Sequence, residues 1–303
     1  MADAQNDLLK LLHETKAVSI WDRKTGPVFW YAASVPGPFY VNTELVIGPA
    51  LADKLLKAIT AIIAETKDPA QRAAKLNEII LGEYKNSDTY RRVIAAMVEK
   101  AKSEFPAGSY DLVSGGERRD WLFSIPFAHE LGIRHAFLFK DGSIYSEQKF
   151  QPGEKALHVA DLINNAASYF DMWFPILSKA QLDCIGTLCV NSRGSNGVNR
   201  LTEHGCKIIA LNAVDTGFFE KSVASGLIEK DTLEEIATYF TSPKQWAAKY
   251  LAANVALFGV PELDGKSFER LKSFFANDPW SLKSEHKDFF ASMDAEIAKR
   301  AKA

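Results

Sequence analysis

The chain has 303 residues, of which 47% are hydrophobic and 24% are charged, and its formal net charge is −2 at pH 7. This length and composition are typical of a globular protein that buries one large core or two smaller ones. The near-neutral charge gives no support to nucleic acid or an anionic membrane surface as a partner, so local groups must hold any anion that binds.

The cysteines and the first residues indicate the compartment. Cys184, Cys189 and Cys206 lie in or beside apolar runs and lack the spacing of zinc ligands. We interpret them as buried free thiols in a reducing environment. The first residues carry acids and no basic segment before an apolar stretch, and no apolar run is long enough to span a bilayer. We therefore expect a cytoplasmic protein without a membrane partner.

The first hundred residues are expected to be mainly helical. Two short apolar segments between residues 18 and 34 predict strands in a hairpin-like arrangement. Apolar residues at helical spacing predict a helix over residues 43–66, which the pair Gly48–Pro49 interrupts. A second helical tract is predicted over residues 69–105, with a break near Gly82.

Beyond this region the pattern changes to short apolar strands that alternate with helices. The expected strands are "YDLVS", "HAFLF", "KALHVAD", "CIGTLCV" and "CKIIALNAV". This order predicts an α/β fold with an open, mainly parallel sheet that helices cover on both faces. We expect three consecutive regions: an N-terminal hood with helices over 1–104, the α/β core over 105–215, and a helical, aromatic-rich C-terminal extension over 216–303.

Three polar loops follow strands of this predicted sheet. They are "SGGERRDW", "DLINNAAS" and "NSRGSNG". Ligands of open parallel sheets bind at the carboxyl ends of the strands, close to the point where the strand order reverses. If the strands are neighbours, the three loops line one crevice.

The loop "DLINNAAS" combines an acidic residue with a turn that begins a helix. Backbone N–H groups at such a turn bind an anion without a basic side chain, and Ser168 adds a hydroxyl. Asp161 is positioned to accept hydrogen bonds from sugar hydroxyls or from water on Mg²⁺. The alternative is that Asp161 only ends the strand while Asn164 or Asn165 caps the helix.

The loop "SGGERRDW" carries a second possible anion site. Gly115 and Gly116 permit a tight turn or the close approach of a ligand. Arg118 and Arg119 present forked, permanently charged donors that suit pyrophosphate. The alternative is that the neighbouring acids neutralise both arginines in a surface ion-pair cluster.

Other catalytic and metal motifs are missing from the sequence. His129, His135 and His158 have no metal-ligand spacing, and we interpret them as structural histidines. The sequence contains no G-x-S-x-G elbow, no P-loop and no G-x-G-x-x-G motif.

The order of these segments resembles that of the type I phosphoribosyltransferases, and of orotate phosphoribosyltransferase in particular. "GPFYVN", at 37–42, is similar to the family's N-terminal substrate-binding segment, and "YDLVSGGERRDWLFSIPFAHELG" to its strand, pyrophosphate loop and helix. "ALHVADLINNAASY" is similar to the signature for phosphoribosyl pyrophosphate, and "GCKIIALNAVD" to the last strand of the core. The resemblance covers about residues 36–215.

This resemblance implies a fold, a reaction and a set of roles. The protein would be a homodimer that uses Mg²⁺ and transfers phosphoribose to a nucleobase, and no residue would bind the metal directly. The implied catalytic residues are Lys140 and Asp161, and the base pocket would be formed by Phe39, Tyr40, Asn191 and Arg193. Asp161, Asn164, Asn165, Ala166, Ala167 and Ser168 would bind the ribose and its phosphate, and Ser114, Gly115, Gly116, Glu117, Arg118 and Arg119 the pyrophosphate.

The signature departs from the family's pattern at two points. The family's two adjacent acids correspond to Ala160 and Asp161, and its Thr-x-Gly-Thr turn corresponds to residues 164–167. Alanine in place of the glycine costs about 1 kcal/mol or more if Ala166 must have a positive φ. Three functions stay open: a phosphoribosyltransferase of unassigned base specificity, a non-catalytic regulatory protein that binds a nucleotide or pyrophosphate, and an interaction protein whose loops bind no ligand.

Overall fold

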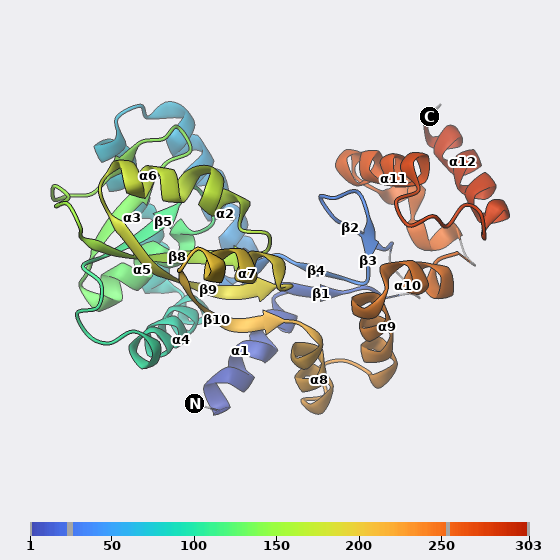
Figure 1. The fold of residues 1–303 in the computed structure, drawn as a ribbon, viewed down its shortest axis with the longest axis horizontal. Coiled ribbons are helices and arrows are strands. Elements are labelled where there is room, and N and C mark those ends of the chain that lie inside the picture. The colour runs from blue at the N-terminus through green and yellow to red at the C-terminus, as the bar shows by residue number, and fades with distance from the viewer. Residues whose placement is uncertain (1, 23–26, 253–254, 302–303) are drawn as a thin grey trace. The chain divides into compact units, whose positions relative to one another are not determined.

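The computed structural model describes residues 2–22, 27–252 and 255–301. The ribbon in Figure 1 follows these residues from the N-terminus to the C-terminus. None of the helices in these ranges has the length and apolar character that a bilayer-spanning segment needs.

The chain forms two compact units, and neither is continuous in sequence. Unit 1 consists of Met1–Ala17 and Asn42–Phe218, and unit 2 consists of Val18–Val41 and Phe219–Ala303. These units differ from the three consecutive regions that we expected from the sequence. The helices that precede the sheet pack together with it, whereas the first strands pack with the C-terminal helices.

Unit 1 is built on a six-stranded sheet with the order β10–β9–β8–β5–β6–β7. Five of the strands are parallel, and β7 runs antiparallel to β6 at one edge. This confirms the expected open, mainly parallel sheet. The strands are β5 (Leu112–Gly116), β6 (Arg134–Leu138), β7 (Ile144–Tyr145), β8 (Lys155–Ile163), β9 (Asp183–Arg193) and β10 (Lys207–Val214).

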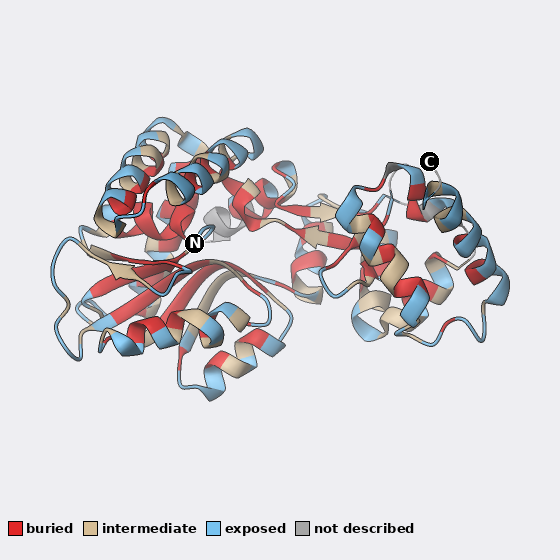
Figure 2. Ribbon diagram, turned by 90° about the horizontal axis from the view of Figure 1, so that it is seen from above, coloured by how far each residue is buried: buried red, intermediate tan, exposed pale blue. Residues whose placement is uncertain are grey.

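The strand order reverses between β5 and β8. From β5 the chain continues through α5 (Trp121–Leu131) to β6 on one side, whereas β8 leads through α6 (Phe174–Lys179) to β9, and α7 (Asn196–Glu203) leads on to β10. Right-handed crossovers in opposite directions place α5 on one face of the sheet and α6 and α7 on the other. Figure 2 shows helices on both faces of the buried strands. The carboxyl ends of β5 and β8 are where a ligand site is expected in such a sheet.

The expected N-terminal helices form, and one of their breaks lies elsewhere than predicted. Gly48 interrupts the first tract as expected, with a φ of 109°, and Pro49 begins the next helix. The second tract breaks at Ser87 and not near Gly82, because the Ser87 hydroxyl caps a new helix by accepting the N–H of Tyr90 at 3.2 Å. These elements are α1 (Ala2–Glu14), η1 (Thr43–Ile47), α2 (Pro49–Glu65), α3 (Pro69–Asn86) and α4 (Asp88–Glu104).

A π-helical turn, η2 (Tyr169–Trp173), leads directly into α6. Its Tyr169 and Trp173 are buried in the same core as apolar residues of β8 and β9. Such turns occur often at functional sites. The three cysteines are free, as expected: Cys189 and Cys206 are buried and Cys184 is partly buried.

Unit 2 begins with four short strands: β1 (Val18–Ile20), β2 (Phe29–Trp30), β3 (Pro36–Gly37) and β4 (Phe39–Val41). β1 pairs with β4 and β2 pairs with β3, both antiparallel. The strands expected between residues 18 and 34 therefore form, but the hairpin-like arrangement was wrong because they do not pair with each other. The polar segment with Gly26 and Pro27 between these strands, which we expected to be a turn, lies partly outside the described residues.

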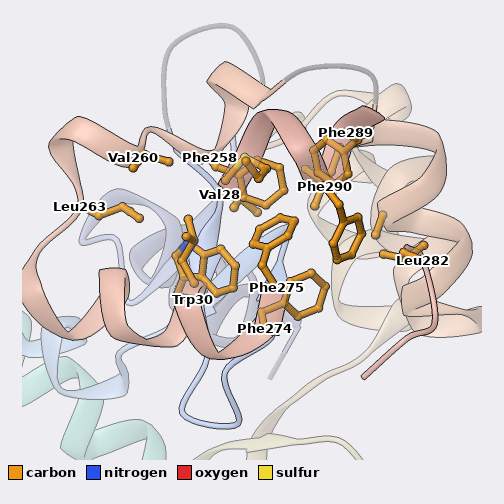
Figure 3. Packing of buried hydrophobic residues seen from close by; sticks show 14 of the residues in the cluster. Val28, Trp30, Phe258, Val260, Leu263, Phe274, Phe275, Leu282, Phe289 and Phe290 are labelled. Carbon is orange, nitrogen blue, oxygen red and sulfur yellow. The ribbon is translucent and has the colours of Figure 1, made fainter. Parts of the chain in front are cut away.

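The remainder of unit 2 is helical, as the sequence predicted, and aromatic residues fill its core. Trp30 of β2 packs against Phe258 and Phe274, and Phe275 packs against Phe290 (Figure 3). The helices that follow the sheet are α8 (Thr216–Ala224), α9 (Lys230–Thr241), α10 (Pro243–Tyr250), η3 (Val255–Phe258), η4 (Val260–Glu262), α11 (Gly265–Asn277) and α12 (Lys287–Ala301).

Candidate functional site

A pocket of about 330 Å³ lies where β5 and β8 end. Two of the three predicted loops line it together with Lys140, which follows β6. The third loop, after β9, does not contribute to the lining. The lining residues are Glu117, Arg118, Arg119, Asp120, Lys140, Ala160, Asp161, Leu162, Asn164, Asn165, Ala166, Ala167, Ser168, Tyr169, Met172 and Trp173.

The two arginines of the first loop are held by partners outside that loop. Arg118 Nη1 donates to Thr60 Oγ1 at 2.6 Å, and Arg119 Nε pairs with Glu44 Oε1 at 3.0 Å. The alternative of a local cluster with the flanking acids is therefore not what the structure shows. The Arg119 side chain is still 54% exposed. Both arginines line the pocket, and their guanidinium groups carry donors that suit phosphate oxygens.

The three residues that begin the predicted pyrophosphate loop lie inside β5 instead. Ser114, Gly115 and Gly116 are buried, and they are not among the lining residues. A Cβ on Gly115 would lie 2.0 Å from Ser124 Oγ, and one on Gly116 would lie 2.3 Å from the Trp173 ring. These glycines let neighbouring elements pack closely against β5, so the second half of the predicted loop forms the pocket wall.

The turn after β8 has the backbone conformation on which the sequence argument depended. Ala166 has a φ of 58°, in the left-handed region that favours glycine. Asn165 Oδ1 accepts the N–H of Ala167 at 3.1 Å, and the carbonyl of Ala166 accepts the N–H of Tyr169 at 3.1 Å. The turn therefore keeps its tight shape although an alanine stands where the resembling family has glycine.

Helix α7 supports this turn from behind. The N–H of Gly197 donates to the Asn164 carbonyl at 2.9 Å, and Arg200 Nη1 donates to the Asn165 carbonyl at 2.5 Å. The Arg200 guanidinium also lies 4.4 Å from the centre of the Phe170 ring. A Cβ at Gly197 would lie 2.3 Å from the Asn164 carbonyl oxygen, so only glycine permits this approach. The third predicted loop, after β9, thus leads into helix α7, which supports the turn of the pocket.

Two carboxyl groups meet between β5 and β8. Asp161 lies on β8 and is partly buried, and its N–H donates to Asp120 Oδ1 at 3.1 Å. Asp120 Oδ2 accepts the N–H of Gly116 at 3.2 Å. Burial, and next the negative charge of Asp120, raise the pKa of Asp161 well above its ordinary value, whereas the charge of Arg119 opposes this shift.

The four residues predicted for a base pocket are not among the described residues that line this pocket. Asn191 is fully buried in unit 1, and its Nδ2 donates to Thr43 Oγ1 at 3.0 Å. Arg193 is the last residue of β9. Phe39 and Tyr40 belong to β4 of unit 2, where Phe39 is buried against Phe219. Their role in binding a base stays a prediction.

Some lining residues were missed by the sequence analysis. Tyr169, Met172 and Trp173 share one face of the helical turns after the 164–168 turn, a placement that their spacing of three and four residues indicates. Asp120 directly precedes the apolar helix pattern, which is the position of a helix cap. The sequence alone gave no sign that its carboxyl group would meet β8.

No protein-family model matches the chain, and no curated protein sequence matches it. Among solved structures it is similar to UMP synthase from Leishmania donovani, with a TM-score of 0.55 and 12% identity over 80% of this chain and 42% of that one. It is also similar to orotate phosphoribosyltransferase from Francisella tularensis, with a TM-score of 0.50 and 11% identity over 76% and 96% of the two chains. The match thus spans less than half the length of the UMP synthase.

At these identities the similarity establishes the fold. The chain has the fold of the type I phosphoribosyltransferases, and it resembles the orotate enzyme. The resemblance seen in the sequence is thereby confirmed for the fold.

Proposed function

We propose that the pocket binds the phosphorylated ribose of phosphoribosyl pyrophosphate or of a nucleotide, and that the protein transfers phosphoribose to a nucleobase. The observation that carries this proposal is the convergence of Arg118, Arg119, Lys140, Asp161 and the 164–168 turn on one pocket. This pocket lies at the reversal of strand order in a sheet of the phosphoribosyltransferase type.

Each part of the pocket has a proposed role. The backbone N–H groups of the 164–168 turn and the Ser168 hydroxyl hold the 5′-phosphate. Asp161 accepts hydrogen bonds from ribose hydroxyls. Arg118, Arg119 and Lys140 bind the pyrophosphate and stabilise the negative charge that develops on it as the bond to the ribose breaks.

Mg²⁺ is part of the proposal, as the sequence resemblance implies. The described residues contain no group of three His, Cys, Asp or Glu side chains arranged to hold a metal ion. Carboxylate oxygens suit Mg²⁺, and Asp161 lines the pocket beside the proposed pyrophosphate site. We propose that Asp161 accepts hydrogen bonds from water on the ion and that the ion, when bound, neutralises pyrophosphate charge.

Thermal unfolding with ligands tests the binding. The ligands are phosphoribosyl pyrophosphate, pyrophosphate and nucleoside monophosphates, each with Mg²⁺. A ligand at a hundredfold excess over its Kd stabilises the native state by about 2.7 kcal/mol. We expect this with phosphoribosyl pyrophosphate, and its loss in the Arg118→Ala/Arg119→Ala variant. Arg91→Ala/Arg92→Ala removes a second adjacent arginine pair, on α4 outside the pocket, and should keep the effect. No stabilisation of the wild type by any ligand would contradict the proposal.

A second candidate is a regulatory protein that binds the same ligands without turnover. Two observations favour it: Asn191 is committed to Thr43 inside the protein, and Ala166 occupies a strained position in the turn. Release of labelled pyrophosphate in the presence of a panel of nucleobases separates the candidates. Release with any base supports the transferase, whereas ligand binding without release supports the regulatory protein.

We further propose a homodimer, on the basis of the sequence resemblance, and a cytoplasmic location, on the basis of the free cysteines. Light scattering during size-exclusion chromatography measures the mass directly. A mass of about one chain of 33.6 kDa across the accessible concentrations would contradict the dimer.

A further inference from the structure

The pocket contains a carboxyl group that the phosphoribosyl-pyrophosphate signature does not supply. In the sequence, Asp161 follows Ala160, so β8 carries one acid where the resembling family has two. In the structure, Asp120 from the start of α5 lies directly beside Asp161, because its Oδ1 accepts the Asp161 N–H at 3.1 Å. Both residues line the same pocket.

Asp120 is held in place from the side of the core. It is 9% exposed, and its Oδ2 accepts the N–H of Gly116 and lies 3.5 Å from Nε2 of His158. His158 is fully buried, and its Nε2 has no hydrogen-bond partner in the described structure. Its Nδ1 lies 3.0 Å from Ser114 Oγ. When the Ser114 hydroxyl donates to Nδ1, Nε2 carries the hydrogen and points at Asp120.

The charges of the pocket indicate which part of a ligand meets Asp120. The lining holds the cations Arg118, Arg119 and Lys140, and also the acids Glu117, Asp120 and Asp161. A phosphate group placed against two neighbouring carboxyl groups would be repelled, whereas a hydroxyl group donates to a carboxylate in a charge-assisted hydrogen bond. The pocket therefore suits a ligand with an anionic end and a neutral end that carries hydroxyl groups.

We propose that Asp120 is a second ligand-contacting carboxylate, which accepts hydrogen bonds from the hydroxyl groups of a sugar phosphate together with Asp161. The Gly116 N–H and His158 position it. This proposal rests on the proposed function and deepens it: the ligand class is a phosphorylated sugar with two neighbouring hydroxyl groups, and recognition of these groups is divided between β8 and α5.

Calorimetric titration with two probes tests the role of Asp120. Ribose 5-phosphate carries the hydroxyl groups, and inorganic phosphate does not. We expect Asp120→Asn to weaken ribose 5-phosphate binding about tenfold or more, as the loss of a hydrogen bond to a charged group does. Phosphate binding should stay within about twofold, because the arginines and the 164–168 turn are intact. Asp171→Asn, on the exposed side of η2, is the matched control and should change neither affinity.

The pattern of losses separates the outcomes. Equal weakening of both probes would mean that Asp120 only braces the loop, which overturns the inference and leaves the proposed function standing. Unchanged binding of ribose 5-phosphate by Asp120→Asn would overturn it as well. If the wild type binds neither probe, the inference and the proposed function both fall.

Discussion

In unit 2, the rings of Phe275 and Phe290 pack with their centres 5.0 Å apart at an angle of 68°, and Trp30 and Phe274 continue the same cluster. In unit 1, the pocket instead gathers carboxyl groups, guanidinium groups and a turn with a left-handed alanine. Edge-to-face rings stabilise a fold directly. A buried carboxyl group and a positive φ at alanine lower its stability. The aromatic core is thus explained by folding alone, whereas the groups of the pocket fit our proposal that it binds a ligand.

The largest expected effect breaks the aromatic core of unit 2. Phe274→Ala removes a ring that is 2% exposed and should lower the free energy of unfolding by about 3–5 kcal/mol. Denaturant unfolding followed by tryptophan fluorescence measures the change. Phe240→Ala is the control, because this ring is 36% exposed and its loss should cost about 1 kcal/mol or less. Equal losses for both variants would contradict the view of this core as the source of stability.

Asp161→Asn, in unit 1, should raise the free energy of unfolding, whereas Phe274→Ala lowers it. Because the pKa of Asp161 is raised in the folded state, its contribution to stability is fully present below the unfolded pKa of about 3.9 and is lost as the pH rises through the folded pKa. The variant should therefore be more stable than the wild type by about 1 kcal/mol at neutral pH. The gap should shrink toward pH 4, and ribose 5-phosphate binding should be weakened. Denaturant unfolding between pH 4 and pH 8 measures the gap, and one that stays constant with pH would contradict the assignment.

A smaller stabilisation is expected from a substitution in the 164–168 turn. Ala166→Gly relieves a left-handed conformation that costs about 1–2 kcal/mol, and this gain exceeds the loss of one buried methyl group. We expect a net stabilisation of about 0.5 kcal/mol, measured as a rise in Tm. Ala167→Gly is the matched control in ordinary helical backbone and should destabilise by about 1 kcal/mol. A stability change of the same sign in both variants would contradict the interpretation that the backbone of Ala166 is strained.

The smallest effect is expected at a surface ion pair of unit 2. Lys244 Nζ lies 2.8 Å from Glu285 Oε1, and the two side chains are 40% and 58% exposed. A double-mutant cycle with Lys244→Ala and Glu285→Ala should give a coupling of about 0.5 kcal/mol or less, which falls further in high salt. A coupling above 1 kcal/mol would mean that charge contributes to unit 2 as strongly as a buried contact.

Much of the fold could be predicted because unit 1 is built from local patterns. Each strand of the parallel sheet is a short apolar run, and each loop at a strand end carries polar residues. Both patterns can be recognised in the sequence. The sequence resemblance raised a positive φ at Ala166 as the condition for a cost, and the structure has a φ of 58° there. The 164–168 turn and the two arginines line one pocket, and their roles in binding stay a prediction.

What the sequence did not reveal depends on contacts between distant segments. Asp120 meets Asp161 only because β5 and β8 are neighbours, and no local pattern states this. The pairing of β1 with β4 has the same origin, since a turn signal between two strands favours a hairpin over longer-range pairing. Gly115 and Gly116 were assigned to the loop after the strand, although they belong to β5, because a glycine in a strand looks like a loop residue.

The division of unit 2 into two segments has a consequence for synthesis. Its strands at Val18–Val41 leave the ribosome early, but the helices that complete the unit come from Phe219–Ala303. At about 5–20 residues per second, tens of seconds at the slower rate separate the two segments. During this interval the strands can pair with each other, but the C-terminal helices that share their core do not yet exist. The whole of unit 1 is complete before the first of those helices is made. Because of the order of translation, unit 1 folds first. The early strands are the part of the nascent chain that most needs a chaperone.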